Sequence, residues 1–364
     1  MGTASRTPGR KRAVRRLGIV AMGLALAAAL TGITAAAAPL PAQRIDVFGG
    51  MKNRPNDGPG TNILLLGTDS RAGLSKSERR RFSTGHRSCD CADTMMLVHV
   101  SANARRVSVV GLPRDSRTAL PEYLDEKTGQ SGPVRPAKLN AAYAAGGPRL
   151  AVRTVEQMTN VRINHYLEID FRRFIDGVNE AGGVRVCTKR RLKDHATRLN
   201  LRPGTHRLSG GRSLQYVRSR HVDRSADLGR MQRQQRFLVG ALRTLSADRS
   251  FAHPRRTARL ARTVLGSTRV DQGFTVGRLT RLTLALRRLS PAATEFTTVP
   301  VAGFSAPQDG VGATLEWDRP KADKVFKTLN RDRALTGRKT SAAPADPPTL
   351  SRQTAFRGHK VACS

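Results

Sequence analysis

"NILLLGTDSRAG", from Asn62 to Gly73, is the stretch that decides the fold. Its first half, Asn62 to Gly67, is an apolar run of the length of one strand, and the turn-forming residues of "TDSRAG" follow it directly. Apolar runs that end in turn residues are typical of strands buried on both faces. We therefore expect a sheet that is covered on both sides and carries polar residues where this strand ends.

Further strands and helices alternate along the chain. Strands are predicted at residues 93–100, 106–112, 163–170 and 294–301. Helices are predicted at residues 147–160, 171–183, 209–217, 228–242, 255–266, 274–289 and in the second half of 313–330. The polar segment 74–88 has no periodicity and is predicted to be a loop. The alternation indicates an α/β fold.

The N-terminus carries a membrane-targeting pattern. Basic residues precede an uncharged run, residues 17–40, and about twenty helical residues span the ~30 Å hydrocarbon core of a bilayer. We expect a cytoplasmic basic tail (1–16), one transmembrane helix (17–40), a linker (41–60), an extracytoplasmic domain (61–331) and a disordered tail (332–364). The protein is then a single-pass protein of the cell membrane. A cleaved signal peptide is the alternative, and in both cases the body is exported.

The charge of the chain narrows its partners. Lys and Arg number 64 and Asp and Glu 27, which gives a formal net charge of +37. Nucleic acid, an anionic membrane surface and an anionic polymer are the partners that such an imbalance favours. Export disfavours nucleic acid and leaves the membrane and the polymer.

The cysteines fit an exported protein, in which disulfides persist. Cys89, Cys91, Cys187 and Cys363 form an even set, and we interpret them as a disulfide framework whose connectivity the sequence does not fix. A zinc site that includes His86 is the alternative, but the spacing lacks a second ligand pair.

Guanidinium groups are concentrated in "YVRSRHVDRSADLGRMQRQQ", residues 216–235. The arginines of this run are Arg218, Arg220, Arg224, Arg230 and Arg233. The planar fork of donors in arginine suits a phosphate or carboxylate ligand. In the helix predicted from 228 to 242, Arg230 and Gln234 lie one turn apart, and Asp227 is placed to cap the helix start. The run can therefore bind one anion; a solvated basic face is the alternative.

Two aspartates are placed at the ends of predicted strands. If these strands are neighbours, Asp69 and Asp93 put two carboxylates at one edge of the sheet, enough for a Mg²⁺ ion that also binds substrate phosphates. Arg71 and Arg114 add guanidinium there, and Asp115 can act as a general base. Each aspartate can instead be a turn, cap or ion-pair residue.

Metal and arginines together suit phosphoryl transfer, because that reaction needs charge neutralisation over the phosphate oxygens. The sequence contains no P-loop, no nucleophile elbow and no HExxH motif. Other common routes to catalysis are therefore disfavoured.

Seven separated motifs resemble those of one family, the LytR-CpsA-Psr phosphotransferases of the cell envelope. In chain order they are "NILLLGTDSR", "CADTMMLVHV", "VVGLPRDS", "KLNAAYAAGGP", "HYLEIDF", "NEAGGVRV" and "YVRSRH…DLGRMQRQQ". They extend over roughly Asn62 to Leu242, about half of the chain. The "CDCADT" form, the Arg- and Ala-rich composition and Cys187 are similar to actinobacterial members.

The resemblance implies a three-layer α-β-α sandwich with a central mixed sheet. It also implies that a glycopolymer is transferred from a polyprenyl-pyrophosphate carrier to peptidoglycan through a phosphodiester bond, with Mg²⁺ or Mn²⁺ as cofactor. One departure from the family is Gly111, where relatives usually carry a larger or hydroxyl residue.

The family's functional residues fall on positions that the strand ends and the arginine run had already grouped. Asp69 and Asp93 are the expected metal ligands. The expected catalytic residues are Asp69, Asp93, Arg114 and Asp115. The expected pyrophosphate-binding residues are Arg71, Arg114, Arg218, Arg220, Arg230 and Gln234. Lys138 and Arg233 lie in matching motifs without an assigned role.

Two other functions stay open. A non-catalytic binder of anionic envelope polymer or lipid would use the positive charge alone. A polyprenyl-pyrophosphate hydrolase would use the same site with water as the acceptor.

Overall fold

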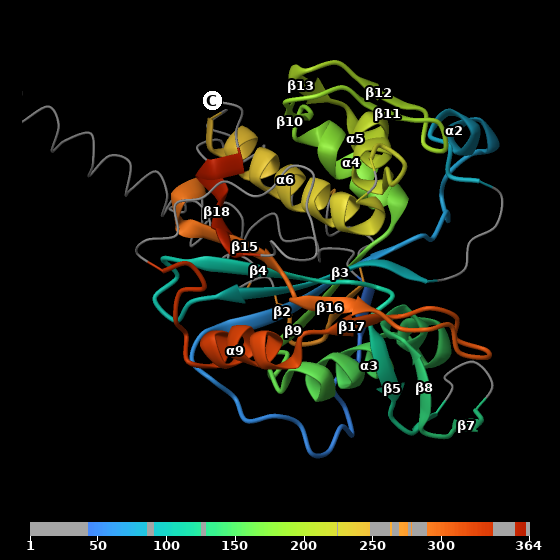
Figure 1. Cartoon of the computed structure of the whole chain (residues 1–364), viewed down its shortest axis with the longest axis vertical. Coiled ribbons are helices and arrows are strands. Elements are labelled where there is room, and N and C mark those ends of the chain that lie inside the picture. The colour runs from blue at the N-terminus through green and yellow to red at the C-terminus, as the bar shows by residue number, and fades with distance from the viewer. Residues whose placement is uncertain are drawn as a thin grey trace, which may run out of the picture. The chain divides into compact units, whose positions relative to one another are not determined.

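The protein is described by a computed structural model, which covers residues 43–85, 91–124, 129–223, 225–247, 263, 269–275, 278, 290–337 and 354–361. An eight-stranded sheet forms its centre, in the order β1-β14-β9-β2-β3-β4-β15-β18 (Figure 1). Its strands are β1 (Gln43–Ile45), β2 (Thr61–Thr68), β3 (Ala92–Val100), β4 (Val107–Leu112), β9 (His165–Ile169), β14 (Arg269–Asp271), β15 (Thr294–Thr298) and β18 (Phe356–Arg357). The predicted central strands are confirmed.

Helices cover both faces of this sheet. They are α3 (Leu139–Thr159), α4 (Phe171–Glu180), α5 (Gly210–Arg218), α6 (Ala226–Ala247) and α9 (Arg319–Asn330). A further short helix, α2 (Lys76–Arg81), has no buried residue. In Figure 1, α4, α5 and α6 lie on one side of the sheet, and α3 and α9 lie on the other. Short strands form hairpins or pairs outside the sheet: β5 (Arg117–Leu120) with β8 (Arg135–Lys138), β6 (Tyr123–Leu124) with β7 (Ser131–Gly132), β10 (Val184–Thr188) with β13 (Gly204–Leu208), β11 (Leu192–Asp194) with β12 (Leu199–Leu201), and β16 (Val301–Phe304) with β17 (Leu315–Trp317).

The two faces of the sheet pack against different helices. Leu64 and Leu66 belong to a buried cluster that includes Val155 of α3 and Phe326 of α9. Side chains from the opposite face, such as Met96, pack in a second cluster with Val239 of α6. This division follows from the alternation of side chains along a strand. The sheet is therefore the middle layer between two layers of helices, as predicted.

The sheet is mixed, and its register brings the site together. β2 pairs with β9 in parallel and with β3 antiparallel, and β4 pairs with β3 antiparallel and with β15 in parallel. The carboxyl ends of β2, β4 and β9 consequently meet the amino end of β3 at one edge. Thr68 pairs with Ala92, so Asp69 and Asp93 extend from neighbouring strand ends. The predicted mixed sheet and the neighbouring strands are both confirmed.

The domain extends beyond its predicted bounds at both ends. β1 lies within the predicted linker 41–60, and it pairs with β14 at one edge of the sheet. β18 lies within the predicted disordered tail 332–364, and it pairs with β15, where Phe356 stacks on Phe296. Strands of two or three residues are held by main-chain hydrogen bonds, so their sequences carry no periodic pattern that could have identified them.

The predicted loop 74–88 is wrong in part, because α2 lies inside it. Ser75 caps this helix by accepting a hydrogen bond from the Glu78 main chain, and the Glu78 side chain accepts one from the Ser75 main chain. None of the helix residues is buried, which explains the missing periodicity. The Ser-x-x-Glu capping box was the signal available in the sequence.

Two longer helices also begin earlier than predicted. α3 begins at Leu139 rather than at residue 147, with a break at Gly146 and Gly147, where the φ of Gly147 is 62°. α6 begins at Ala226 rather than at residue 228. Gly111 of β4 lies against α6, since a Cβ atom on it would be 3.0 Å from Cε of Met231. The missing side chain at this position thus allows close contact between the sheet and α6.

Some predictions lie outside the described residues. They concern the tail 1–16, the transmembrane run 17–40 and almost all of the two basic helices 255–266 and 274–289. Among the helices that are described, none combines the length and the apolar character that crossing a bilayer requires.

Candidate functional site

A cavity of about 860 Å³ lies between the sheet and the helices α4, α5 and α6. β2, β3 and the three helices supply most of its lining, and the strand pairs β10–β13 and β11–β12 add residues such as Val184 and Asp194. The apolar side chains that line it include Leu65, Met96, Phe171, Phe174, Phe237 and Leu238. These side chains offer no hydrogen bonds, so the interior of the cavity suits a hydrocarbon.

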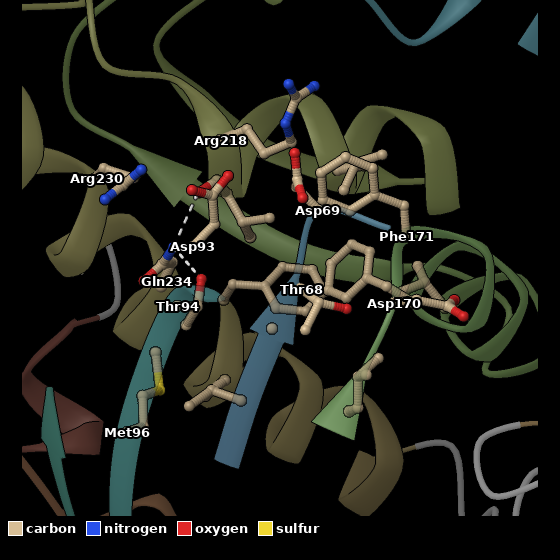
Figure 2. Close-up of a pocket in the computed structure, with 18 of the residues that line it drawn as sticks. Thr68, Asp69, Asp93, Thr94, Met96, Asp170, Phe171, Arg218, Arg230 and Gln234 are labelled. Atoms are coloured by element: carbon tan, nitrogen blue, oxygen red, sulfur yellow. Dashed lines mark hydrogen bonds between the residues drawn. The ribbon is translucent and has the colours of Figure 1, made fainter. Parts of the chain in front are cut away.

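Charged and polar residues line one end of the same cavity. Seven of the predicted site residues are among the lining residues: Asp69, Asp93, Arg114, Arg218, Arg220, Arg230 and Gln234. Asp170, Arg173, Asp194 and His221 also line the cavity. Figure 2 shows Asp69, Asp93 and Arg218 together at this end, with Met96 farther down the pocket. The predicted pyrophosphate-binding residues thus lie at one end of a cavity with an apolar interior.

Arg71 and Asp115 do not line the cavity but contact residues that do. The guanidinium of Arg71 lies 3.6 Å from Oδ2 of Asp69. Oδ2 of Asp115 lies 3.4 Å from Nε of Arg114. The buried atoms Arg71 Nε, Arg71 Nη1 and Arg230 Nε have no hydrogen-bond partner among the residues that the structure describes. Buried donors of this kind are suited to an anionic ligand.

The two carboxylates expected to bind metal are held differently. Oδ1 of Asp69 accepts a hydrogen bond of 3.3 Å from the main chain of Cys91, which precedes β3. Oδ1 of Asp93 accepts one of 2.5 Å from Nη1 of Arg114. Two carboxylates are the number with which Mg²⁺ is usually held when phosphate and water supply the other oxygens. No group of three or more metal-ligating side chains occurs in the described part of the chain.

The loop that carries Arg114 and Asp115 is fixed by the strands around it. The main-chain N–H of Leu315 donates to the carbonyl of Asp115, and the Trp317 indole donates to Oγ of Ser116 at 2.8 Å. Burial opposes the charge of Arg114, but three carboxylates around it raise its pKa. Burial also opposes ionisation of Asp115, and the cations of Arg114 and Lys138 outweigh it and lower the pKa of Asp115. Both groups are therefore charged at neutral pH.

Arg218 and Arg230 keep their charges in buried surroundings. The guanidinium of Arg218 lies 4.9 Å from the centre of the Phe171 ring and donates to the carbonyl of Ser83 at 3.1 Å. Burial lowers the pKa of Arg218, and it lowers the pKa of Arg230 to about 10. A guanidinium with that pKa is still protonated at pH 7, and poor hydration leaves it ready to bind an anion.

Asp227 does not cap α6, contrary to the prediction. The helix begins at Ala226, so Asp227 lies in its first turn, and its carboxylate points to three arginines. Oδ1 lies 3.0 Å from Nε of Arg220, and Oδ2 lies 3.3 Å from Arg230 and 3.8 Å from Arg114. Asp227 is thus the acidic centre of the arginine cluster.

Further hydrogen bonds and ion pairs of the predicted motif residues support the site. Gln234 donates to Oγ1 of Thr94 at 2.8 Å, which links α6 to the start of β3. The guanidinium of Arg233 donates to the Ser219 carbonyl at 2.5 Å, and Nζ of Lys138 lies 3.3 Å from Asp115. Arg224 lies outside the described residues.

The cysteines favour the disulfide interpretation over the zinc site. Cys91 and Cys187 are both disulfide-bonded. Cys89, Cys363 and His86 lie outside the described residues, so the connectivity stays open.

Residues 37–331 match the LytR_cpsA_psr family. The chain therefore belongs to this family. The match covers most of the sequence and confirms the resemblance drawn from the seven motifs. Similarity to actinobacterial proteins is also confirmed, because one relative is a probable cell wall biosynthesis protein, LcpB, of Corynebacterium glutamicum. It is 33% identical over 271 residues, which are 74% of this chain and 61% of LcpB.

The chain is also similar to other proteins and to solved structures of the LytR_cpsA_psr family. The transferase TagU of Oceanobacillus iheyensis, named a polyisoprenyl-teichoic acid–peptidoglycan teichoic acid transferase, is 30% identical over half of each chain. The structure of a LytR-Csp2A-Psr enzyme from Actinomyces oris matches with a TM-score of 0.59 and 22% identity, over 79% of this chain and 96% of that one. At this identity the likeness shows the shared fold. The chain spans about 61% and 50% of the lengths of LcpB and TagU.

Sequence reasoning on this LytR_cpsA_psr chain missed one further buried carboxylate. Asp194 lines the cavity and is 1% exposed. It lies in a hairpin that was not predicted, and its partners on the arginine run are 26 and 27 residues away in sequence. No local pattern marks such a contact.

Proposed function

We propose that this chain is a phosphotransferase that moves a glycopolymer from a polyprenyl-pyrophosphate carrier to peptidoglycan during cell wall assembly. The observation that carries the proposal is one cavity whose lining combines apolar side chains with Asp69, Asp93, Arg114, Arg218, Arg220 and Arg230. A polyprenyl pyrophosphate has the same division, with a hydrocarbon tail and a diphosphate headgroup. The name of TagU states a polyisoprenyl-linked donor and a peptidoglycan acceptor for that relative.

The apolar part of the cavity would bind the prenyl tail. Each buried CH₂ group contributes about 0.8 kcal/mol, so even a part of a long tail gives substantial affinity. The guanidinium groups of Arg218, Arg220 and Arg230 would bind the diphosphate oxygens at the end of the cavity. Headgroup and tail would thus be bound by different side chains, although α5 and α6 contribute to both parts of the cavity.

The reaction joins an acceptor oxygen to the phosphorus that carries the glycopolymer. The bond from this phosphorus to the bridging oxygen breaks, polyprenyl phosphate leaves, and the proton of the acceptor hydroxyl passes to a base. Asp115 is ionised and can accept that proton, but its lowered pKa makes it a weak base. We therefore assign the larger part of the rate enhancement to charge neutralisation by Arg114, Arg218 and Arg230.

Asp69 and Asp93 are the residues that would hold Mg²⁺ or Mn²⁺, and the bound ion would supply further positive charge to the diphosphate. Their carboxylate oxygens on adjacent strand ends fit a hard cation. Arg71 and Arg114, which pair with Asp69 and Asp93, would keep these carboxylates oriented.

Export and anchoring belong to the same proposal. The run 17–40 would hold the domain at the outer surface of the membrane, where a polyprenyl carrier presents its headgroup. The positive charge of the chain would favour both the anionic membrane surface and an anionic glycopolymer.

The decisive assay incubates the full chain in detergent with a polyprenyl-pyrophosphate-linked glycan, Mg²⁺ and peptidoglycan fragments. Glycan covalently joined to the fragments, with release of polyprenyl phosphate, is the expected result. Arg218→Ala should abolish it. Glycan phosphate released into water without transfer would identify a hydrolase, and binding without any product would identify a non-catalytic binder; either result overturns the proposal.

A further inference from the structure

The strongest feature outside the predicted site residues is the set of hydrogen bonds around Asp194. This residue ends β11, and its side chain is almost fully buried. Oδ1 accepts hydrogen bonds from the main-chain N–H groups of Ala196 (2.9 Å) and Thr197 (3.2 Å), which close the β11–β12 hairpin. This oxygen therefore serves the hairpin to which Asp194 itself belongs.

The other oxygen of Asp194 serves the arginine loop, which we define as residues 218–221. Oδ2 accepts hydrogen bonds from the main-chain N–H groups of Arg220 (2.8 Å) and His221 (3.0 Å). These two N–H groups lie beyond the end of α5 at Arg218, so they do not donate to carbonyl groups of the helix. A buried carboxylate thus determines the path of the main chain between two arginines of the site.

The arginine loop is also held from its other side. Oγ of Ser219 donates to the Gln215 carbonyl and lies 2.8 Å from Oγ1 of Thr197, and the Ser219 side chain is fully buried. The guanidinium of Arg233 donates to the Ser219 carbonyl. Each residue from 219 to 221 is therefore fixed by a main-chain hydrogen bond to a group of the surrounding fold.

We propose that Asp194 is a positioning residue, which holds the main chain of the arginine loop so that Arg218 and Arg220 face the diphosphate before it binds. The inference rests on the proposed function, because it concerns the same headgroup. A ligand with two phosphate groups needs several guanidinium groups in one fixed arrangement, whereas a monophosphate needs fewer. Loss of Asp194 should therefore weaken diphosphate binding more than monophosphate binding.

The test compares the affinities of the full chain for geranylgeranyl pyrophosphate and geranylgeranyl monophosphate. For Asp194→Ala, we expect the affinity for the pyrophosphate to fall on the order of tenfold and that for the monophosphate by about twofold or less. A merely structural role would lower the folded fraction and would reduce both affinities by the same factor. The matched control is Asp318→Ala, which removes a carboxylate that accepts a main-chain N–H at the start of α9. In this control the ratio of the two affinities should stay unchanged.

Hydrogen exchange on the wild-type chain gives a second test if the variant does not fold. Without ligand, the amides of Arg220 and His221 should exchange slowly, because a buried carboxylate binds both. Rapid exchange of these amides until ligand is added, or an unchanged affinity ratio in folded Asp194→Ala, would overturn the inference. A wild-type chain that binds neither ligand would instead overturn the proposed function.

Discussion

Oδ1 of Asp227 lies 3.0 Å from Nε of Arg220, inside the cluster that we assign to the diphosphate. An anionic ligand bound there would share its arginines with an acidic side chain of the protein. Asp227 therefore sets how strongly the cluster attracts anions, as well as how its guanidinium groups are oriented.

Replacement of this carboxylate should strengthen anion binding. In Asp227→Asn, we expect the affinity for inorganic pyrophosphate to rise about fivefold, because one negative charge near three arginines is removed. The affinity should also fall more steeply with salt. Calorimetric titrations at two salt concentrations measure both effects. Glu316→Gln is the control, since its carboxylate pairs with Arg117 on the surface; a lower affinity in Asp227→Asn would contradict the role as counter-charge.

The tail and headgroup parts of the cavity should be separable by mutation. Leu238→Asp puts a charge on the apolar wall, so it should abolish binding of a prenyl pyrophosphate and leave binding of inorganic pyrophosphate within about twofold of wild type. Fluorescence competition with the two ligands measures the difference. The same substitution at Leu124, which is 64% exposed, should change neither affinity. Equal loss of both ligands in a folded Leu238→Asp chain would argue against a tail site.

If Asp69 and Asp93 both bind the metal ion, substitution of either one should have the same effect on transfer. Asp69→Asn and Asp93→Asn should each abolish Mg²⁺-dependent transfer, since each removes one carboxylate ligand. Loss of the Asp93 charge should also leave Arg114 with two of its three carboxylate partners, Asp115 and Asp227. Transfer rates measured over a series of Mg²⁺ concentrations check the assignment, and full activity of both variants would remove it.

Close contact at Gly111 predicts a cost for any larger residue. Gly111→Val should destabilise the fold by about 1–3 kcal/mol, because its Cβ would be 3.0 Å from Cε of Met231. Urea unfolding gives the free energy. Compared with Gly111→Val alone, the Gly111→Val, Met231→Ala double variant should recover part of the lost free energy of unfolding. No recovery would mean that the strain does not come from Met231.

We expect the contribution of Asp194 to the stability of the fold to be lost at low pH. Burial opposes its ionisation, but four main-chain N–H donors outweigh it and lower the pKa of Asp194 below its usual value. A carboxylate whose pKa is lower in the folded state stabilises the fold above its unfolded pKa of about 3.9, and this contribution is lost as the pH falls further. Ionisable side chains near Asp194 include His221, whose Nδ1 lies 3.8 Å away, and Arg233, which interacts with it electrostatically.

The difference in melting temperature between wild type and Asp194→Ala should consequently be largest above about pH 4 and shrink below it. Thermal melts from pH 6 down to pH 2.5 measure this trend. A difference that stays constant over the whole range would mean that the ionised form of Asp194 does not stabilise the fold.

The strand ends made much of the site predictable. Asp69, Asp93 and Arg114 each lie next to an apolar run, and sheet topology brings such ends to one edge. The contacts of Asp194 with Arg220 and His221, and of Asp227 with Arg114, were not predictable, because only the tertiary fold brings these residues near each other. From the sequence alone, Asp227 was predicted to cap the helix. In the structure its carboxylate instead contacts Arg114, Arg220 and Arg230.

The central claim is that the cavity holds a polyprenyl chain with its phosphate groups at the arginine cluster. Native mass spectrometry of the full chain, purified in mild detergent from a cell-wall-forming host, tests it most directly. We expect a polyprenyl phosphate or pyrophosphate bound to the wild-type chain and missing from folded Leu238→Asp. A wild-type chain that carries no polyprenyl lipid, even after incubation with polyprenyl pyrophosphate, would contradict the account.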